Sequence, residues 1–227
     1  MDKLEELTRA LEVNRAVYDA VLRYIRSGVS EREIYELTKT TIDEMLKDVS
    51  HEFIGDFVGG KRCGKIGGDP TDYILSSGDG FILDLSVRYG NTWSDTCRTF
   101  FLGEPSDEIK KAYDVALKLQ SFGATFVKPE ICAENVKIEA EKLLESLGYG
   151  NMMPHHMGHL IGSEPYMIPA FDINHKEILS EGVFFTLEPG LYKEGEWGLR
   201  VENDYILQFG GAKNLFDYPT EIEHFII

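Results

Sequence analysis

Residues Phe81 to Phe100 read FILDLSVRYGNTWSDTCRTF, and this stretch predicts a pair of adjacent strands. In its first part, apolar side chains alternate with a second face that carries Asp84. The turn residues Gly90 and Asn91 lead into a second strand, one face of which carries Asp95. A hairpin of this kind is expected to bring Asp95 opposite Asp84. Because like charges repel at short range unless a proton or a cation lies between them, the two carboxylates indicate a divalent metal site.

The composition limits the classes of partner. The chain has 227 residues, enough to bury the core of one large or two small domains. It carries 23 basic and 39 acidic residues, a net charge of -16, which disfavours nucleic acid and anionic membranes as partners. Its 3 cysteines lack a metal-binding spacing and fit free thiols in a reducing compartment. The start MDKLEELTRALEV does not resemble a signal peptide, and no run reaches the ~18 apolar residues of a membrane span, so a cytoplasmic location is expected.

Apolar periodicity predicts a chain of mixed helices and strands. One predicted helix begins with the capping box Ser30-x-x-Glu33. Helices are expected over residues 4–26, 30–46, 108–122 and 133–147. Besides the central pair, strands are expected within HEFIGDFVGG at 51–60 and over residues 182–187, 199–207 and 221–227.

The order of these elements indicates an internal duplication. AVYDAVL at residues 16–22 reappears as KAYDVAL at residues 111–117, and each copy is followed by a second helix and then by strands that carry acids. Chance similarity is the alternative, because helices with this spacing are common. We favour two half-repeats, about 1–104 and 105–227, with the site where the halves meet.

A glycine-rich segment could be mistaken for a nucleotide site. GGKRCGKI at residues 59–66 nearly fits the phosphate-binding pattern G-x-x-x-x-G-K-[ST]. Ile66, however, stands where the pattern needs a magnesium-binding hydroxyl, and GGDPTD follows where a helix must begin. We therefore expect a turn-rich loop at the mouth of the site.

The second half supplies three further candidate metal ligands. His159 lies in MPHHMGHLIG, Glu188 ends the apolar stretch GVFFTLEPG, and Glu202 lies in GLRVENDYIL. Taken singly, a histidine in a turn or a solvated glutamate is ordinary, whereas a carboxylate on a buried strand is costly unless paired or metal-bound. With Asp84 and Asp95 they form an oxygen-rich set that suits two divalent ions better than one structural zinc. Two ions about 3.5 to 4 Å apart can share a bridging water and polarise a carbonyl, which favours hydrolysis.

Five segments, in this order, resemble the pita-bread metallopeptidases, which include methionine aminopeptidase, Xaa-Pro aminopeptidase and prolidase. The segments are LDLSV, SDTCRTF, MGHLIG, FTLEPG and GLRVEN, all between residues 83 and 203, and the resemblance covers nearly the whole chain. The resemblance implies an α+β pita-bread fold, in which two pseudo-symmetric halves place helices outside a curved antiparallel sheet. It further implies a single metallopeptidase-like catalytic domain over residues 1–227, without the N-terminal domain of prolidase-type relatives.

The resemblance also implies a role for each ligand. Asp84 would bind one metal ion, and His159 with Glu188 would bind the other. Asp95 and Glu202 would bridge the two ions, and Glu188 would also handle the proton as a catalytic residue. Mn²⁺ or Co²⁺ is expected, with Zn²⁺ and Fe²⁺ left open, because all four accept carboxylate and imidazole donors.

Two more residues place the chain nearer the Xaa-Pro aminopeptidase and prolidase branch. By the resemblance, His155, four residues before His159, is a second catalytic residue. Arg200, two residues before Glu202, would orient the metal-binding carboxylates. The neighbouring His156 is expected to be incidental.

The chain departs from the family pattern at two positions. Relatives usually carry a histidine about 17 residues before the first aspartate ligand, where this chain has Gly67, and another seven residues after the ligand histidine, where it has Tyr166. Those imidazoles contact the substrate carbonyl and the developing oxyanion, and loss of one such donor lowers the rate ~10²- to 10³-fold. Tyr166 keeps a hydroxyl donor and is the candidate substrate-binding residue, whereas Gly67 offers only backbone.

These expectations combine into one principal function and two alternatives. The oligomeric state, including a homodimer, and the substrate are left open by the sequence. The alternatives are a dimetal enzyme that cleaves a C–N or C–S bond in a small molecule, and a metal-binding homologue without activity. We expect a metal-dependent hydrolase that removes the N-terminal residue from short peptides, as an Xaa-Pro aminopeptidase or dipeptidase.

Overall fold

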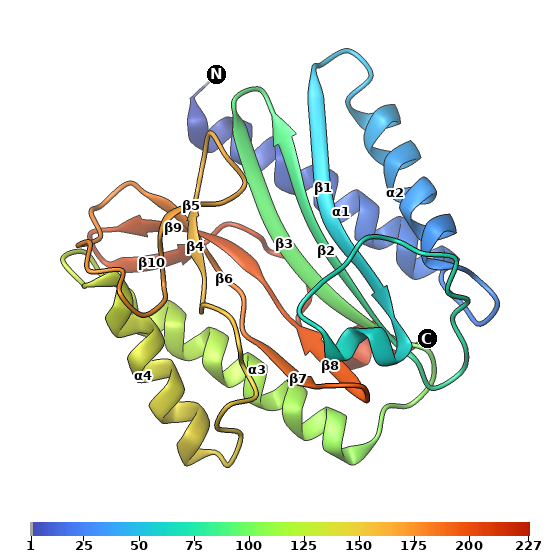
Figure 1. The fold of residues 1–227 in the computed structure, drawn as a ribbon. Coiled ribbons are helices and arrows are strands. Elements are labelled where there is room, and N and C mark those ends of the chain that lie inside the picture. Colours follow the sequence, from blue (N-terminus) through green and yellow to red (C-terminus); the bar gives the residue numbers. More distant parts are fainter. Residues whose placement is uncertain (1) are drawn as a thin grey trace.

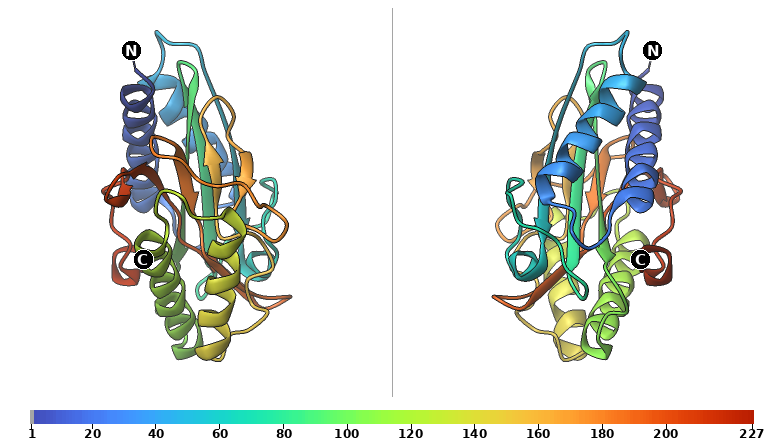
Figure 2. Two further views of the ribbon diagram at one scale, coloured as in Figure 1. Left: turned by 90° about the vertical axis from the view of Figure 1, so that its left-hand side faces the viewer. Right: turned by 90° about the vertical axis from the view of Figure 1, so that its right-hand side faces the viewer.

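The computed structural model describes residues 2–227 and shows helices packed against antiparallel strands (Figure 1). The first half of the chain forms α1 (Lys3–Tyr24), α2 (Glu31–Met45), β1 (His51–Gly59), the 3₁₀ helix η1 (Gly60–Gly64), β2 (Gly80–Tyr89) and β3 (Thr92–Phe101). The second half forms α3 (Asp107–Phe126), α4 (Ala133–Ser146), β4 (His159–Ile161), β5 (Met167–Ala170), β6 (Phe184–Leu187), β7 (Gly190–Lys193), β8 (Trp197–Arg200), β9 (Asn203–Gln208), β10 (Gly211–Asn214) and the 3₁₀ helix η2 (Ile222–Phe225). Seen from the side, α1 and α3 lie along the same side of the strands (Figure 2). The predicted α+β class is confirmed.

Side chains cap the starts of α1, α2 and α3, and each helix buries an apolar stripe. The Asp2 side chain accepts a hydrogen bond from the first turn of α1 at 2.8 Å. The predicted capping box of α2 is present, because Ser30 and Glu33 each bond the other's backbone. Asn14, the polar break in the stripe of α1, is fully buried, and its amide donates to Leu85 O at 2.9 Å. This amide fixes α1 against the hairpin that carries the candidate metal ligands.

Strand pairing brings the second-half strands against the hairpin. Within residues 2–227, a three-stranded sheet has the order β1-β2-β3, a five-stranded sheet the order β10-β9-β6-β4-β5, and β7 pairs with β8. All of these pairs are antiparallel. Cys97 on β3 and Glu202, between β8 and β9, exchange backbone hydrogen bonds of 3.3 and 3.1 Å. One candidate ligand therefore lies where the two halves of the chain join.

The register of the hairpin differs from the expectation. The two-residue turn sets a register in which Asp84 lies opposite Cys97 and Asp95 lies opposite Ser86. The prediction that Asp95 lies directly opposite Asp84 is therefore wrong. Because side chains alternate along a strand, the two aspartates still share one face as diagonal neighbours. The residue opposite Asp84 on the other side is Asp56, on β1.

The predicted helices are present, with small differences at their ends, but the later strands differ more. The strand predicted over 199–207 is divided into β8 and β9, because the residues between them bond other backbone groups. The strand predicted over 221–227 is wrong: this segment forms η2, and a parallel bridge joins Ile226 to Phe101. Strands β4, β5, β7 and β10 are too short for alternation to reveal them.

Within residues 2–227, two large hydrophobic clusters and one small one form the core. Of the two large clusters, one centres on α1 and α2 against β1, β2 and β3, and the other on α3 and α4 against the later strands. Arg98 on β3 is fully buried and donates to Glu202 O at 2.7 Å and to Pro219 O at 2.8 Å. Its guanidinium also lies 5.1 Å from the ring centre of Phe216. The half-repeats, 1–104 and 105–227, stay a prediction.

The helices also bear on membrane association. Within residues 2–227, none of them combines the length and the hydropathy that crossing a membrane requires.

Candidate metal centre

The side chains expected to bind metal converge from separate strands. Asp84 lies on β2 and Asp95 on β3, while His159 begins β4. Glu188 follows β6 directly, and Glu202 lies between β8 and β9. His159 Nε2 lies 3.5 Å from both Asp95 Oδ2 and Glu188 Oε1. One donor atom each from Asp95, His159 and Glu202 lies within 4.8 Å of the others, close enough to hold one ion.

The local fold presents one nitrogen of His159 to the acidic side chains. Its Nδ1 lies 3.0 Å from Leu160 O, so the Nδ1–H donates to this carbonyl and Nε2 keeps its lone pair. At Gly158, a Cβ atom would lie 2.0 Å from Thr186 O. Glycine at this position therefore allows the start of β4 to approach β6 closely.

Glu202 is almost completely buried, with 1% of its surface exposed. Neither of its carboxylate oxygens has a hydrogen-bond partner within residues 2–227. Burial raises the pKa of Glu202 well above its usual value, and the charges of Asp95 and Asp84 raise it further. An ionised carboxylate without a partner is costly to bury, so these oxygens fit the binding of a cation.

The same effects act on the two aspartates. Burial raises the pKa of Asp95 well above its usual value, and Asp84 and Asp204 add to the effect. Burial also raises the pKa of Asp84 to about 6, although the guanidinium of Arg200 opposes this. Without metal, burial thus favours the protonated form of both carboxylates, whereas a divalent ion would favour the ionised form.

Arg200 lies between Asp84 and Asp56. It is 2% exposed, and its Nη2 donates to Asp56 Oδ2 at 2.8 Å and forms an ion pair with Asp84 Oδ2 at 2.7 Å. Its Nη1 donates to Ile66 O at 2.7 Å and to Tyr192 OH at 3.1 Å. These contacts fix the orientation of Asp84. The contact with Ile66 also ties the glycine-rich segment, which forms η1 and a loop leading into β2, to the site.

Asp56 explains why the chain has glycine at position 67. A Cβ atom at Gly67 would lie 2.2 Å from Asp56 Oδ2, and Gly68 N donates to Asp56 Oδ1 at 2.9 Å. The Asp56 carboxylate thus fills the space beside Gly67, and a histidine there has no room unless Asp56 moves. The sequence reasoning missed Asp56. The signal that could have found it is the pairing of β1 with β2, which sets it opposite Asp84.

Glu188 also contacts two histidines that precede β4. His156 Nδ1 lies 2.9 Å from Glu188 Oε1, and His155 Nδ1 lies 3.9 Å from Glu188 Oε2. Burial would raise the pKa of Glu188, but His156, His159 and His155 outweigh it and lower the pKa to about 2. Burial lowers the pKa of His155 to about 4, so this imidazole is neutral at pH 7. His156, which was expected to be incidental, is therefore in contact with the site.

Tyr166 lies at the solvent-exposed edge of the cluster formed by Glu188 and the histidines. It is 48% exposed, and its ring centre lies 4.6 Å from that of His159 and 5.5 Å from that of His156. An exposed phenol beside buried donors can meet a substrate that approaches from solvent. Its role in substrate binding stays a prediction.

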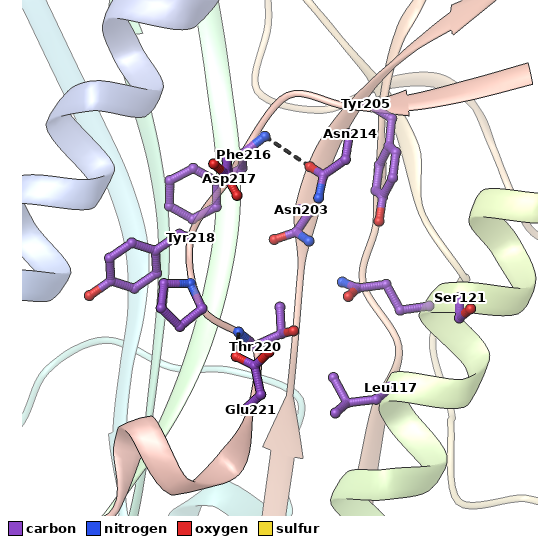
Figure 3. Close-up of a pocket in the computed structure, with 12 residues that line it drawn as sticks. Leu117, Ser121, Asn203, Tyr205, Asn214, Phe216, Asp217, Tyr218, Thr220 and Glu221 are labelled. Atoms are coloured by element: carbon purple, nitrogen blue, oxygen red, sulfur yellow. Dashed lines mark hydrogen bonds between the residues drawn. The ribbon is translucent and has the colours of Figure 1, made fainter.

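A pocket of about 540 Å³ lies apart from these donors, between α3 and the C-terminal segment (Figure 3). Its lining includes Leu117 from α3, Tyr205 from β9, and Glu221. It also includes Asn203, whose Oδ1 accepts a hydrogen bond from Arg98 Nη2 at 2.8 Å. None of the expected metal ligands lines this pocket.

Known proteins resemble this chain in sequence and in fold. The sequence is 28% identical over 218 residues to an uncharacterized peptidase of Staphylococcus aureus, covering 96% of this chain and 62% of that protein. The structure resembles X-Pro aminopeptidase from Thermotoga maritima, with a TM-score of 0.91 and 30% identity over 99% of this chain and 62% of that one. It also resembles prolidase from Pyrococcus furiosus, with a TM-score of 0.90 and 26% identity over 96% of this chain and 64% of that one. The chain thus spans less than two thirds of the length of these relatives.

The sequence also matches a known family over most of its length. Residues 5–208 fit the pattern described as Metallopeptidase family M24. The span includes every residue expected to bind metal, and the helices outside an antiparallel sheet are the pita-bread arrangement of the relatives. The chain belongs to metallopeptidase family M24.

Proposed function

We propose that this chain is a metal-dependent peptidase that removes the N-terminal residue from short peptides, as an Xaa-Pro aminopeptidase or dipeptidase. The observation that carries the proposal is the buried Glu202 carboxylate, which lacks a hydrogen-bond partner in the described chain and lies within reach of Asp95 and His159. Membership of a metallopeptidase family, and likeness to X-Pro aminopeptidase and prolidase, support the same chemistry. Because those relatives are longer, the substrate of the whole protein is part of the proposal.

The proposed centre holds two divalent ions, Mn²⁺ or Co²⁺, with Zn²⁺ and Fe²⁺ as alternatives. Asp84 would hold one ion, His159 and Glu188 the other, and Asp95 and Glu202 would lie between them. When bound, such a pair lowers the pKa of a shared water from 15.7 toward roughly 7 and polarises a carbonyl. The buried, oxygen-rich donor set supports this assignment, as does the lone pair of His159 Nε2 near two carboxylates.

The remaining side chains would bind and orient the substrate and move the proton. Burial would raise the pKa of Glu188, but three histidines outweigh this effect and lower the pKa to about 2. Glu188 is therefore ionised at neutral pH and can accept a proton. His155 is neutral, and its Nδ1 lies 3.9 Å from Glu188 Oε2, so we propose it as a second catalytic residue beside this carboxylate. Arg200 holds Asp84 in place. Tyr166 offers a hydroxyl donor at the exposed edge of the site.

A second candidate is a dimetal enzyme that cleaves a C–N or C–S bond in a non-peptide small molecule. Asp56 favours it, because this carboxylate fills the space beside Gly67, where relatives usually carry a histidine. An ionised carboxylate cannot donate a hydrogen bond to a developing oxyanion. The transition state of peptide hydrolysis would therefore lack one hydrogen-bond donor, which would lower the rate ~10²- to 10³-fold.

The cysteines and the charge bear on location and partners. Cys63, Cys97 and Cys132 are free, and two of them are buried. Buried free thiols fit a reducing compartment, and we propose the cytoplasm. The net charge of -16 supports short peptides or small molecules, rather than nucleic acid, as partners.

Turnover of Xaa-Pro, Met-Ala and Ala-Ala dipeptides and tripeptides, with Mn²⁺ or Co²⁺ added, tests the proposal. We expect the native protein to release the N-terminal residue and Glu188→Ala to lower the rate ~10²- to 10⁴-fold, because it removes the proton acceptor. A matched control is Glu177→Ala, at a side chain that is 52% exposed, which should keep full activity. Bound metal without peptide turnover would favour the second candidate, and absence of bound metal would overturn both.

A further inference from the structure

We propose that His156 is an additional metal ligand, so that the ion assigned to His159 and Glu188 is held by two imidazoles. The inference rests on the proposed metal centre and deepens it, because it specifies the donor set of one ion. The family resemblance gives no ligand role to this residue. The evidence is the position of its Nδ1 atom.

The Nδ1 atom of His156 lies beside a ligand oxygen without being aimed at it. It is 2.9 Å from Glu188 Oε1, yet both atoms are buried and neither forms a hydrogen bond within residues 2–227. In a hydrogen bond, the N–H would point at the oxygen. Two buried polar atoms this close, without the alignment of a hydrogen bond, have the spacing of two ligands of one cation.

The distances between the donor atoms fit a single ion. Two donors about 2.1 Å from one ion lie about 3.0 Å apart at an octahedral right angle and about 3.4 Å apart at a tetrahedral angle. The separation of His156 Nδ1 from Glu188 Oε1 is 2.9 Å, and that of His159 Nε2 from the same oxygen is 3.5 Å. The ring centres of the two histidines lie 5.4 Å apart, and one nitrogen of each approaches the same Glu188 oxygen.

The loop that carries His156 is held in place by buried contacts. Lys137 on α4 is 4% exposed and donates to Met153 O at 3.2 Å and also to His155 O. The His155 ring donates from Nδ1 to His156 O at 2.7 Å. A side chain on such a restrained loop meets a ligand without a large loss of conformational entropy.

A second imidazole would change which metal the site prefers. Imidazole suits Zn²⁺, Fe²⁺ and Co²⁺, whereas a donor set of carboxylates alone suits Mn²⁺. Removal of His156 should therefore weaken Zn²⁺ and Co²⁺ binding more than Mn²⁺ binding. A residue that only oriented Glu188 would affect these metals alike.

The test is a metal titration of the chelator-treated protein with Zn²⁺ and Mn²⁺, by calorimetry, for the native protein, His156→Ala and His156→Asn. We expect both variants to lose more than ~100-fold in Zn²⁺ affinity at one of the two metal sites. Substitution of a residue that only orients a ligand typically lowers metal affinity about 10- to 100-fold. Mn²⁺ affinity should fall by less. The visible absorption of the Co²⁺ form should also change in both variants, because a nitrogen donor is lost.

Three results separate the alternatives. If Asn restores Zn²⁺ affinity, or if Zn²⁺ and Mn²⁺ weaken equally, His156 is a positioning residue and the inference is overturned. If the native protein binds neither metal, the proposed function fails with it. His175→Ala, at a side chain 28% exposed that contacts Glu177, is the control for loss of a histidine. Melting temperature measured without metal shows that each variant folds.

Discussion

The Glu202 side chain is subject to two opposing demands. Its oxygens are buried without a hydrogen-bond partner in the described part of the chain, which suits the binding of a cation. In the metal-free protein, the same burial penalises the ionised carboxylate. Burial, together with Asp95 and Asp84, therefore raises the pKa of Glu202 well above its usual value. A donor that binds metal well thus destabilises the fold when the metal is absent.

Glu202→Gln separates these two demands because it keeps the shape and removes the charge. We expect the bound metal to fall from two ions to fewer than one per chain, measured by mass spectrometry of the metals. We also expect the metal-free variant to be about 1–3 kcal/mol more stable than the native chain in urea, since a neutral amide replaces the buried carboxylate at position 202. Glu223→Gln, at an exposed position, is the control. Unchanged metal content would refute the role of Glu202 as a ligand.

Gly67→His tests the contact between positions 67 and 56. Because a Cβ atom at Gly67 would lie 2.2 Å from Asp56 Oδ2, we expect the variant to lose about 1–3 kcal/mol in free energy of unfolding. The double variant with Asp56→Ala should lose less than the sum of the two single losses, because the clash is absent. Gly150→His, at a position with ordinary neighbours at 3.7 Å, is the control in the same urea titrations. Strictly additive losses in free energy of unfolding would show that the side chains at positions 67 and 56 do not clash.

Residue types and spacing predict the donors but not their neighbours. Asp84 and Glu188 could be identified because each lies in an otherwise apolar strand segment that resembles a family motif. Asp56 and His156 could not, because their importance arises from contacts across strands and loops, with Arg200 in one case and Glu188 in the other. Such contacts depend on strand register and loop packing, which one sequence does not reveal.

At the scale of elements, β3 connects the two parts of the fold through Arg98. This side chain is fully buried and donates to Cys97 O, Glu202 O and Asn203 Oδ1 at 2.7 to 2.8 Å. It also reaches Pro219 O at 2.8 Å. A buried guanidinium with this many acceptors holds β3 against the segment that carries Glu202 and against the C-terminal segment.

Arg98→Met should destabilise the protein by about 3–5 kcal/mol, because it leaves several buried carbonyl groups without their donor. Thermal and urea unfolding would measure the loss. Arg9→Met is the matched control: the Arg9 side chain is 53% exposed and pairs with Glu12, and exposed pairs contribute only about 0.2–1 kcal/mol. Equal effects of the two substitutions would contradict the connecting role of Arg98.

Long elements could be predicted from the sequence, and short ones could not. The apolar stripes of α1 and α3 and the alternation in β2 each extend over several turns or pairs, so their period is evident. The segment 221–227 is too short to show such a period, and it packs against β3 as the 3₁₀ helix η2 with one bridge rather than as a strand. Tertiary contacts, rather than local preference, decide such short segments.

At the scale of the whole molecule, the donors come from both parts of the chain. Asp84 and Asp95 lie on the sheet that packs against α1, whereas His159, Glu188 and Glu202 lie on strands that follow α4. The family motifs predicted this convergence, although the distances between donors required the structure. A bound metal pair would therefore connect the two large hydrophobic clusters as well as bind substrate.

Metal binding should stabilise the whole molecule, and more so at pH 7 than at pH 5. Burial raises the pKa of Asp84 to about 6 from its ordinary value of 3.8. The protonated group therefore stabilises the metal-free fold fully below pH 3.8, and this contribution is lost as the pH rises through about 6. A metal ion favours the ionised form and must displace protons at pH 5 but few at pH 7, so its affinity rises with pH.

Calorimetric melting in chelator and in excess Mn²⁺, at both pH values, measures this difference. At a free metal concentration 100-fold above Kd, the ion adds about 2.7 kcal/mol, or roughly 5–10 °C in Tm for a chain of this size. We expect this gain at pH 7 and less than about half of it at pH 5. Because the samples with chelator and with Mn²⁺ are compared at the same pH, groups that titrate alike in both do not contribute to the difference between them. His155, whose pKa burial lowers to about 4, is such a group. K⁺ at equal ionic strength controls for screening of the net charge of -16. An equal gain at both pH values would mean that the metal does not bind to these carboxylates.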